Sequence, residues 1–78
     1  MTIRFTKVTP GIALSADEAK KLKKQMAALI EGMGSPGQGT ALHIPDFKTD
    51  RGEKKKVNFK VLNRDSSGDY DIELISIV

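Results

Sequence analysis

The sequence predicts a single α+β domain over residues 1–78, in which one amphipathic helix packs on a small, mostly antiparallel sheet. Two patterns predict this fold: one segment repeats apolar residues at helical spacing, and four segments alternate apolar with polar residues. The length of 78 residues and the hydrophobic content of 38% leave room for only one compact core. The expected order of elements is β-α-β-β-β.

The first strand is expected over residues 3–8. Ile3 and Phe5 alternate with polar residues, which places both side chains on one face. Pro10 and Gly11 follow and end the strand, because this pair favours a turn.

The helix is expected from Ala16 to Met33. Ser15 and Glu18 form the capping-box pattern, in which each side chain satisfies a backbone N–H group at the helix start. Glycines and a proline over residues 32–37 end the helix. The predicted core stripe recurs at spacings of three and four residues and consists of Ala19, Leu22, Met26, Leu29, Ile30 and Met33.

The second strand is expected within residues 40–47, with Leu42 and Ile44 facing inward. Pro45 has no N–H group for a sheet ladder, so it places this strand at an edge or marks its end. Residues 48–56 are expected to form a charged loop.

The last two strands are expected to form a hairpin around a turn at residues 65–68. A four-residue turn pairs residues whose numbers sum to 133. The predicted cross-strand pairs are Val61 with Ile72, Phe59 with Leu74, and Lys60 with Glu73. A slip of two residues, to a sum of 131, is the alternative; it keeps the same faces and sets Lys60 opposite Asp71. Because an acid lies opposite Lys60 in both registers, Lys60 is interpreted as a structural residue.

The aromatic residues favour no base-stacking surface. Phe5, Phe59 and Tyr70 are expected in the core, which leaves Phe47 as the one ring free to stack on a nucleotide.

The sequence lacks the residues that several classes of function require. The chain has no cysteine, which excludes a thiolate site, and its one histidine, His43, lies in a strand without evident partners for a triad or a metal site, so it is interpreted as a surface or boundary residue. The glycines at positions 32, 34 and 37 match a dinucleotide-binding spacing, but they follow a helix instead of preceding one. We therefore expect no catalytic residues, no cofactor and no metal site. No apolar run reaches the ~18 residues of a membrane span, and a soluble, cytoplasmic protein is expected.

Charge is unevenly distributed. Residues 1–60 contain twelve Lys and Arg against six Asp and Glu, whereas residues 61–78 contain one Arg against four acids. The candidate partner-binding residues combine basic residues without nearby acids and two apolar residues near the chain end. They are Lys23, Lys24, Arg51, Lys54, Lys55, Lys56, Ile75 and Ile77.

Alternatives remain open for these residues. In a regular strand Ile75 and Ile77 fall on the face opposite the core, where they form an exposed partner surface or the strand is covered on both sides; otherwise a bulge turns them back. The lysines at 54–56 bind an anionic partner, or they only discourage edge pairing.

The predicted function is that of a small non-enzymatic protein that docks on a larger protein partner. A short chain without recognisable catalytic residues is typical of the inhibitors with which phages and mobile elements block a larger protein complex of the host. The alternative is a nucleic-acid-binding module that uses the basic loop and the helix face. A homodimer through the C-terminal strand is a further arrangement that the apolar chain end allows.

Overall fold

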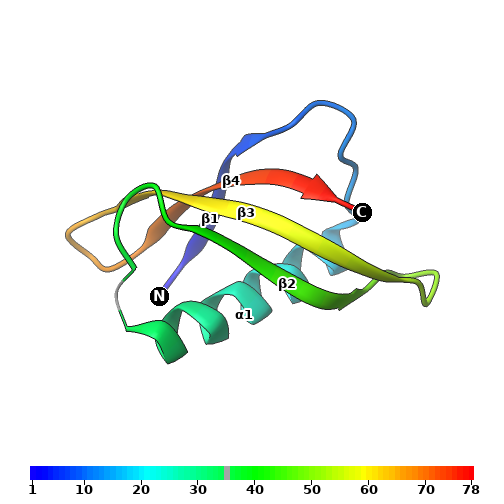
Figure 1. Ribbon diagram of the computed structural model, residues 1–78, viewed down its shortest axis with the longest axis horizontal. Helices are drawn as coiled ribbons and strands as arrows, with labels where there is room; N and C mark the ends of the chain where they lie inside the picture. The colour runs from blue at the N-terminus through cyan, green and yellow to red at the C-terminus, as the bar shows by residue number, and fades with distance from the viewer. Residues whose placement is uncertain (35) are drawn as a thin grey trace.

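One helix lies against one face of a four-stranded sheet (Figure 1). The computed structural model describes residues 1–34 and 36–78; Ser35, within the segment predicted to end the helix, lies outside the described residues. The prediction of a single α+β unit is confirmed. The elements are, in chain order, β1 (Ile3–Val8), α1 (Ala16–Met33), β2 (Ala41–Lys48), β3 (Lys54–Arg64) and β4 (Tyr70–Ile77).

The strand order is β1-β4-β3-β2. β2 pairs with β3 and β3 with β4 in antiparallel fashion, whereas β1 runs parallel to β4. β2 is an edge strand, as Pro45 predicts. β4 lies between two neighbours, so a homodimer through this strand would have to use its side chains and not its main chain.

The helix begins with the predicted capping box. Ser15 Oγ accepts a hydrogen bond from the Glu18 N–H at 3.0 Å, and Glu18 Oε1 accepts one from the Ser15 N–H at 2.9 Å. This backbone donor lowers the pKa of Glu18 below its ordinary value. The second carboxylate oxygen of Glu18 accepts from the Asp50 N–H at 3.0 Å, so the helix start is tied to the turn after β2.

The core forms between α1 and the sheet. The buried helix residues Leu22, Met26 and Ile30 recur every four positions and cover the inward side chains of the strands. Met33, predicted as part of this stripe, is half exposed, because it is the last residue of α1. The fully buried sheet residues are Phe47, Val57, Phe59, Val61, Ile72 and Leu74.

Each strand contains one β-bulge, where it has one residue more than its neighbour. The extra residue is Thr6 in β1, Leu62 in β3 and Ile75 in β4, and in β2 the shift lies between Ile44 and Phe47. Because side chains alternate between the two faces of a strand, each bulge reverses which later residues face the helix.

The bulge in β2 overturns the expectation that Phe47 is free. Ile44 pairs with Val57 and Phe47 pairs with Lys55, so three residues on β2 span the distance of two on β3. The extra residue returns Phe47 to the core face, where its exposed fraction is 0%. The Lys21 ammonium lies 4.9 Å from the centre of this ring.

The predicted loop at residues 48–56 is shorter than expected. Lys48 pairs with Lys54 and Phe47 with Lys55, so the hairpin continues through the charged residues. The Thr49 N–H donates to the Glu53 carbonyl at 2.8 Å and closes a turn that contains Gly52, whose φ is +80°. Lys54, Lys55 and Lys56 therefore belong to β3 and not to a loop.

The predicted register of the last hairpin is confirmed. Lys60 pairs with Glu73, and the two flanking pairs also match. The turn is one residue longer than predicted and includes Asp69, whose N–H donates to Asp65 Oδ1 at 3.0 Å. The bulge at Leu62 absorbs the extra residue before the core pairs are reached.

Candidate partner-binding face

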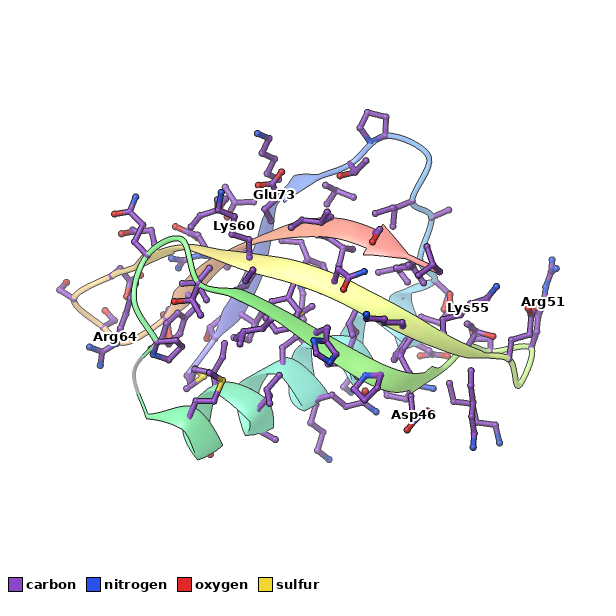
Figure 2. The ribbon with its side chains drawn as sticks, viewed as in Figure 1. Asp46, Arg51, Lys55, Lys60, Arg64 and Glu73 are labelled. Atoms are coloured by element: carbon purple, nitrogen blue, oxygen red, sulfur yellow. The ribbon has the colours of Figure 1, made fainter. Side chains whose placement is uncertain are left out.

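The sheet face opposite α1 is open to solvent. On β3, Val57, Phe59 and Val61 are buried under the helix, so the residues between them point to the open face. Figure 2 shows Lys60 and Glu73 together on this side, away from α1. The core therefore leaves the side chains of the open face available for contact with a partner.

Four lysines gather on the open face beside the β2–β3 hairpin. Alternation along β3 places Lys54, Lys56 and Lys60 on it, and Lys48 lies directly opposite Lys54 on β2. We call Lys48, Lys54, Lys56 and Lys60 the lysine row. Successive lysines two residues apart on a strand are separated by about 6.8 Å. The row thus presents three positive charges along β3, with Asn58 between Lys56 and Lys60, and a fourth on β2 opposite Lys54.

The row is held in place by its main chain. The Lys56 N–H donates to the Val78 carbonyl at 2.7 Å, and the Val78 N–H donates to the Lys56 carbonyl at 2.9 Å. These two bonds pair Lys56 with Val78 on the β4 side, while the bulge in β2 leaves Lys56 without a partner in that strand, and the Val78 pair fixes the direction of the Lys56 side chain.

The other half of the open face is neutralised by ion pairs. Arg4 contacts three acids: its distances are 2.7 Å to Asp71, 2.9 Å to Asp65 and 3.9 Å to Asp69. Lys7 lies 3.8 Å from Glu73. These contacts lower the pKa of Asp71 and of Asp65, chiefly through the hydrogen bonds that Arg4 donates.

The lysine row has no such partners among the residues that the structure describes. None of its members forms a salt bridge there, and Glu73, which pairs with Lys60 in the register, directs its carboxylate to Lys7. Lys48 and Lys54 face each other as like charges, an arrangement that costs folding stability. An anionic partner would relieve this repulsion.

The structure divides the predicted basic patch. Lys54 and Lys56 lie on the open face. The side chain of Lys55 points to the other face of β3 and lines a cavity of about 230 Å³ beside Phe47 and Ile77. Lys55 also lies 3.4 Å from Glu53. Arg51 is exposed at the tip of the β2–β3 hairpin, at the far end of the sheet from Arg64 (Figure 2).

The predicted helix residues lie on the other side of the molecule. The Lys23 ammonium lies 5.1 Å from the centre of the Phe5 ring and is half-buried, while Lys24 is exposed on the outer surface of α1. Lys23 and Lys24 are thus not brought together with Lys54 and Lys56, because the sheet separates them.

Ile75 and Ile77 are also separated. Asn58 pairs with Ser76 and Phe59 with Leu74, so Ile75 is the extra residue of the bulge, with an exposed fraction of 37%. Ile77 pairs with Val57 and packs, half-buried, against the core. The bulge alternative is therefore the one found, and the two residues form no continuous apolar patch.

Sequence reasoning missed Lys48 and gave Lys60 a structural role. Lys48 was missed because residues 48–56 were expected to form a loop, and Lys60 was given a structural role because the hairpin register sets an acid opposite it. Had β3 been extended to Lys54, the spacing of Lys54, Lys56 and Lys60 by even numbers would have placed all three on one face.

The described part of the chain contains neither a metal-binding cluster nor a membrane-spanning helix. No group of three or more His, Cys, Asp or Glu residues at positions 1–34 and 36–78 could hold a metal ion. No helix in those ranges is both long enough and apolar enough to cross a membrane. His43 is exposed on β2 and pairs with Asn58 in the register.

Comparison with known proteins adds no assignment: no protein-family model, curated sequence or solved structure matches the chain.

Proposed function

We propose that the protein is a non-catalytic binding protein that docks on an acidic surface of a larger protein through the open sheet face. The observation that carries this proposal is the lysine row, which projects from a β-strand without salt bridges to the described residues. Fixed main chain lowers the entropic cost of binding, since only the lysine side chains must be ordered.

The composition of the face favours a protein over a nucleic acid. A protein surface offers charges of both signs, and the open face carries Asp71 and Glu73 beside the lysines. Phe47, Phe59 and Tyr70 are buried and Phe5 packs against the core, so the aromatic rings are not available for base stacking. A protein that docks without catalysing a reaction acts by covering a surface of its partner, which is how a steric inhibitor works.

Charge reversal tests the proposal. The row variant, Lys54→Glu/Lys56→Glu, reverses two charges of the lysine row. The helix variant, Lys20→Glu/Lys24→Glu, reverses two charges on the exposed side of α1. Each variant and the wild type would be used to capture partners from cells of the native source, and the affinity for the captured partner would be measured by calorimetry. We expect the first variant to bind at least about tenfold more weakly and the second to bind like the wild type.

The stability of the same variants excludes an indirect effect. Lys54→Glu replaces a like-charge pair with an opposite-charge pair across from Lys48, so the row variant should melt no lower than the wild type. If the helix variant loses the partner and the row variant keeps it, the open face is not the docking surface.

A nucleic-acid partner is the second candidate, and the four lysines that share one face without salt bridges to the described residues are the observation that favours it. Four neutralised phosphates would give a slope of about −3 in a plot of log affinity against log salt concentration. Anisotropy of labelled single- and double-stranded DNA and RNA of about 20 nucleotides, measured from ~50 mM salt upward, tests this candidate. Absence of binding at the lowest salt concentration removes it.

A further inference from the structure

We propose that the groove between α1 and the free edge of β2 binds an extended peptide segment of a partner, which adds to the sheet as a fifth strand. The groove has a volume of about 360 Å³ and is lined by residues 43–46 of β2 and by Gln25, Ala28 and Leu29 of α1. We call it the edge groove. It lies on the side of the sheet opposite to the lysine row, so this proposal does not depend on the proposed function.

The edge of β2 offers main-chain hydrogen bonds. The Val61 N–H donates to the Thr40 carbonyl at 2.9 Å, and residues of an antiparallel pair alternate in the direction of their peptide groups. The peptide groups of Leu42 and Ile44 therefore face β3, and those of Ala41 and His43 face the open edge. Pro45 ends this stretch because it has no N–H group, so the segment bound there is short.

Gln25 supplies a buried acceptor in the groove wall. Its Oε1 atom is buried and has no hydrogen-bond partner among the described residues. A buried acceptor left without a partner costs free energy, and a turn of the Gln25 amide into the groove would let a peptide N–H group satisfy it. This unpaired atom distinguishes the edge groove from a merely apolar crevice.

The lining of the groove sets the chemistry of the peptide. Ala28, Leu29, Ile44 and Pro45 form an apolar wall suited to one aliphatic side chain. Asp46 is exposed at the same site, on the helix side of β2 (Figure 2), and forms no salt bridge to the described residues. Its charge is complementary to a lysine or arginine. The occupant is thus an extended segment with an aliphatic residue and a nearby basic residue, bound by strand addition in a helix–strand groove.

Selection of peptides tests the proposal. A phage-displayed library of linear peptides of about 12 residues would be selected on the full chain and counter-selected on Ala28→Arg. Ala28 is exposed, so arginine there fills the groove without disturbing the core. We expect enriched sequences to pair an aliphatic with a basic residue, and synthetic copies to bind Ala28→Arg at least about tenfold more weakly than the wild type.

A matched pair of variants isolates the charge. Asp46→Asn and Glu31→Gln each remove one exposed carboxylate, but only Asp46 lines the edge groove. Affinity for the selected peptide should fall several-fold in Asp46→Asn, by about 1 kcal/mol or less, and stay unchanged in Glu31→Gln. Gln25→Leu should lower the affinity for the peptide. It should leave the stability of the free protein unchanged, because it replaces an unpaired polar atom with an apolar one.

Amide NMR spectra locate the bound peptide. Addition of the peptide should shift the amide signals of Ala41 and His43 and leave those of Ile3 and Phe5, at the opposite edge of the sheet, in place. Selection that yields no sequence preferring the wild type over Ala28→Arg overturns the proposal. Signal changes confined to β1 or to the lysine row also overturn it.

Discussion

The side chains of Arg4 and Asp71 join the first strand to the last. Arg4 Nε donates to Asp71 Oδ1 at 2.7 Å, and the same oxygen accepts from Thr6 Oγ1 at 3.0 Å. Arg4 also donates to Asp65 Oδ2 at 2.9 Å, so one guanidinium connects β1 to both β4 and the turn before it. The parallel β1–β4 pair has no short connection of its own, and these contacts hold its register at the open face.

The Arg4 contacts predict a specific pH dependence. Because Arg4 lowers the pKa of Asp65 and of Asp71 in the folded state, their contribution to stability is complete above the unfolded pKa of about 3.9 and is lost as the pH falls through the depressed values. The stability difference between the wild type and Arg4→Met should therefore be largest near pH 7 and vanish in strong acid.

Carboxyl NMR titration and urea unfolding at several pH values check this prediction. In Arg4→Met the pKa values of Asp65 and Asp71 should rise toward their ordinary range. Lys7→Met is the control, because Lys7 contacts neither carboxylate, and it should leave both values unchanged. Equal titration curves in the wild type and Arg4→Met would contradict the assigned role.

Local patterns in the sequence specify much of this fold. Ser15 and Glu18 mark the helix start because both backbone donors are satisfied within four residues, and the helix bounds match the prediction. The Lys60–Glu73 pair follows from hairpin counting, since the two strands are adjacent in the chain. In contrast, nothing local places β1 beside β4, because that pairing depends on contacts between the two ends of the chain.

The bulges limit what can be predicted of the site. An extra residue breaks the alternation from which each side chain is assigned to a face. The free-energy cost of a bulge depends on packing across the sheet and not on the identity of the extra residue. Phe47 was assigned to the wrong environment for this reason, and the environment of Ile77 stayed open between a bulge and a regular strand. Pro45 is the one bulge position with a visible signal, and it indicated only an irregular edge.

Truncation of Phe47 tests the bulge in β2. Because the ring is fully buried, Phe47→Ala should lower the free energy of unfolding by about 3–5 kcal/mol. Phe47→Leu, which keeps most of the apolar volume, should cost about 1.5 kcal/mol or less. Urea denaturation followed by circular dichroism measures both. A loss under ~1 kcal/mol in Phe47→Ala would show that the ring is exposed and the strand regular.

Substitution of the two terminal isoleucines tests the bulge in β4. Ile77 packs against the core, so Ile77→Ser should lower the free energy of unfolding by about 1–2 kcal/mol. Ile75 is the exposed extra residue, and Ile75→Ser should stay within about 0.5 kcal/mol of the wild type. Thermal and urea unfolding compare the variants directly. The reverse order of effects would mean that β4 continues without a bulge and presents Ile77 to solvent.

The link between the helix start and the β2–β3 turn predicts an energetic coupling. Ser15 Oγ accepts from the Glu18 N–H and also donates to Asp50 Oδ2 at 2.6 Å, so one hydroxyl serves both the cap and the turn. Ser15→Ala should lower the free energy of unfolding by about 1–2 kcal/mol. Ser67→Ala is the matched control, because only the main chain of Ser67 donates a hydrogen bond in its turn, and it should be neutral within about 0.5 kcal/mol.

A double-mutant cycle separates the cap from the turn. If the hydroxyl joins the two elements, Asp50→Ala should cost less in the Ser15→Ala background than alone, with an interaction energy of at least about 0.5 kcal/mol. Urea denaturation of the four proteins supplies the cycle. Strict additivity would show that the Ser15–Asp50 hydrogen bond makes no contribution, and the capping box alone would then account for the cost of losing Ser15.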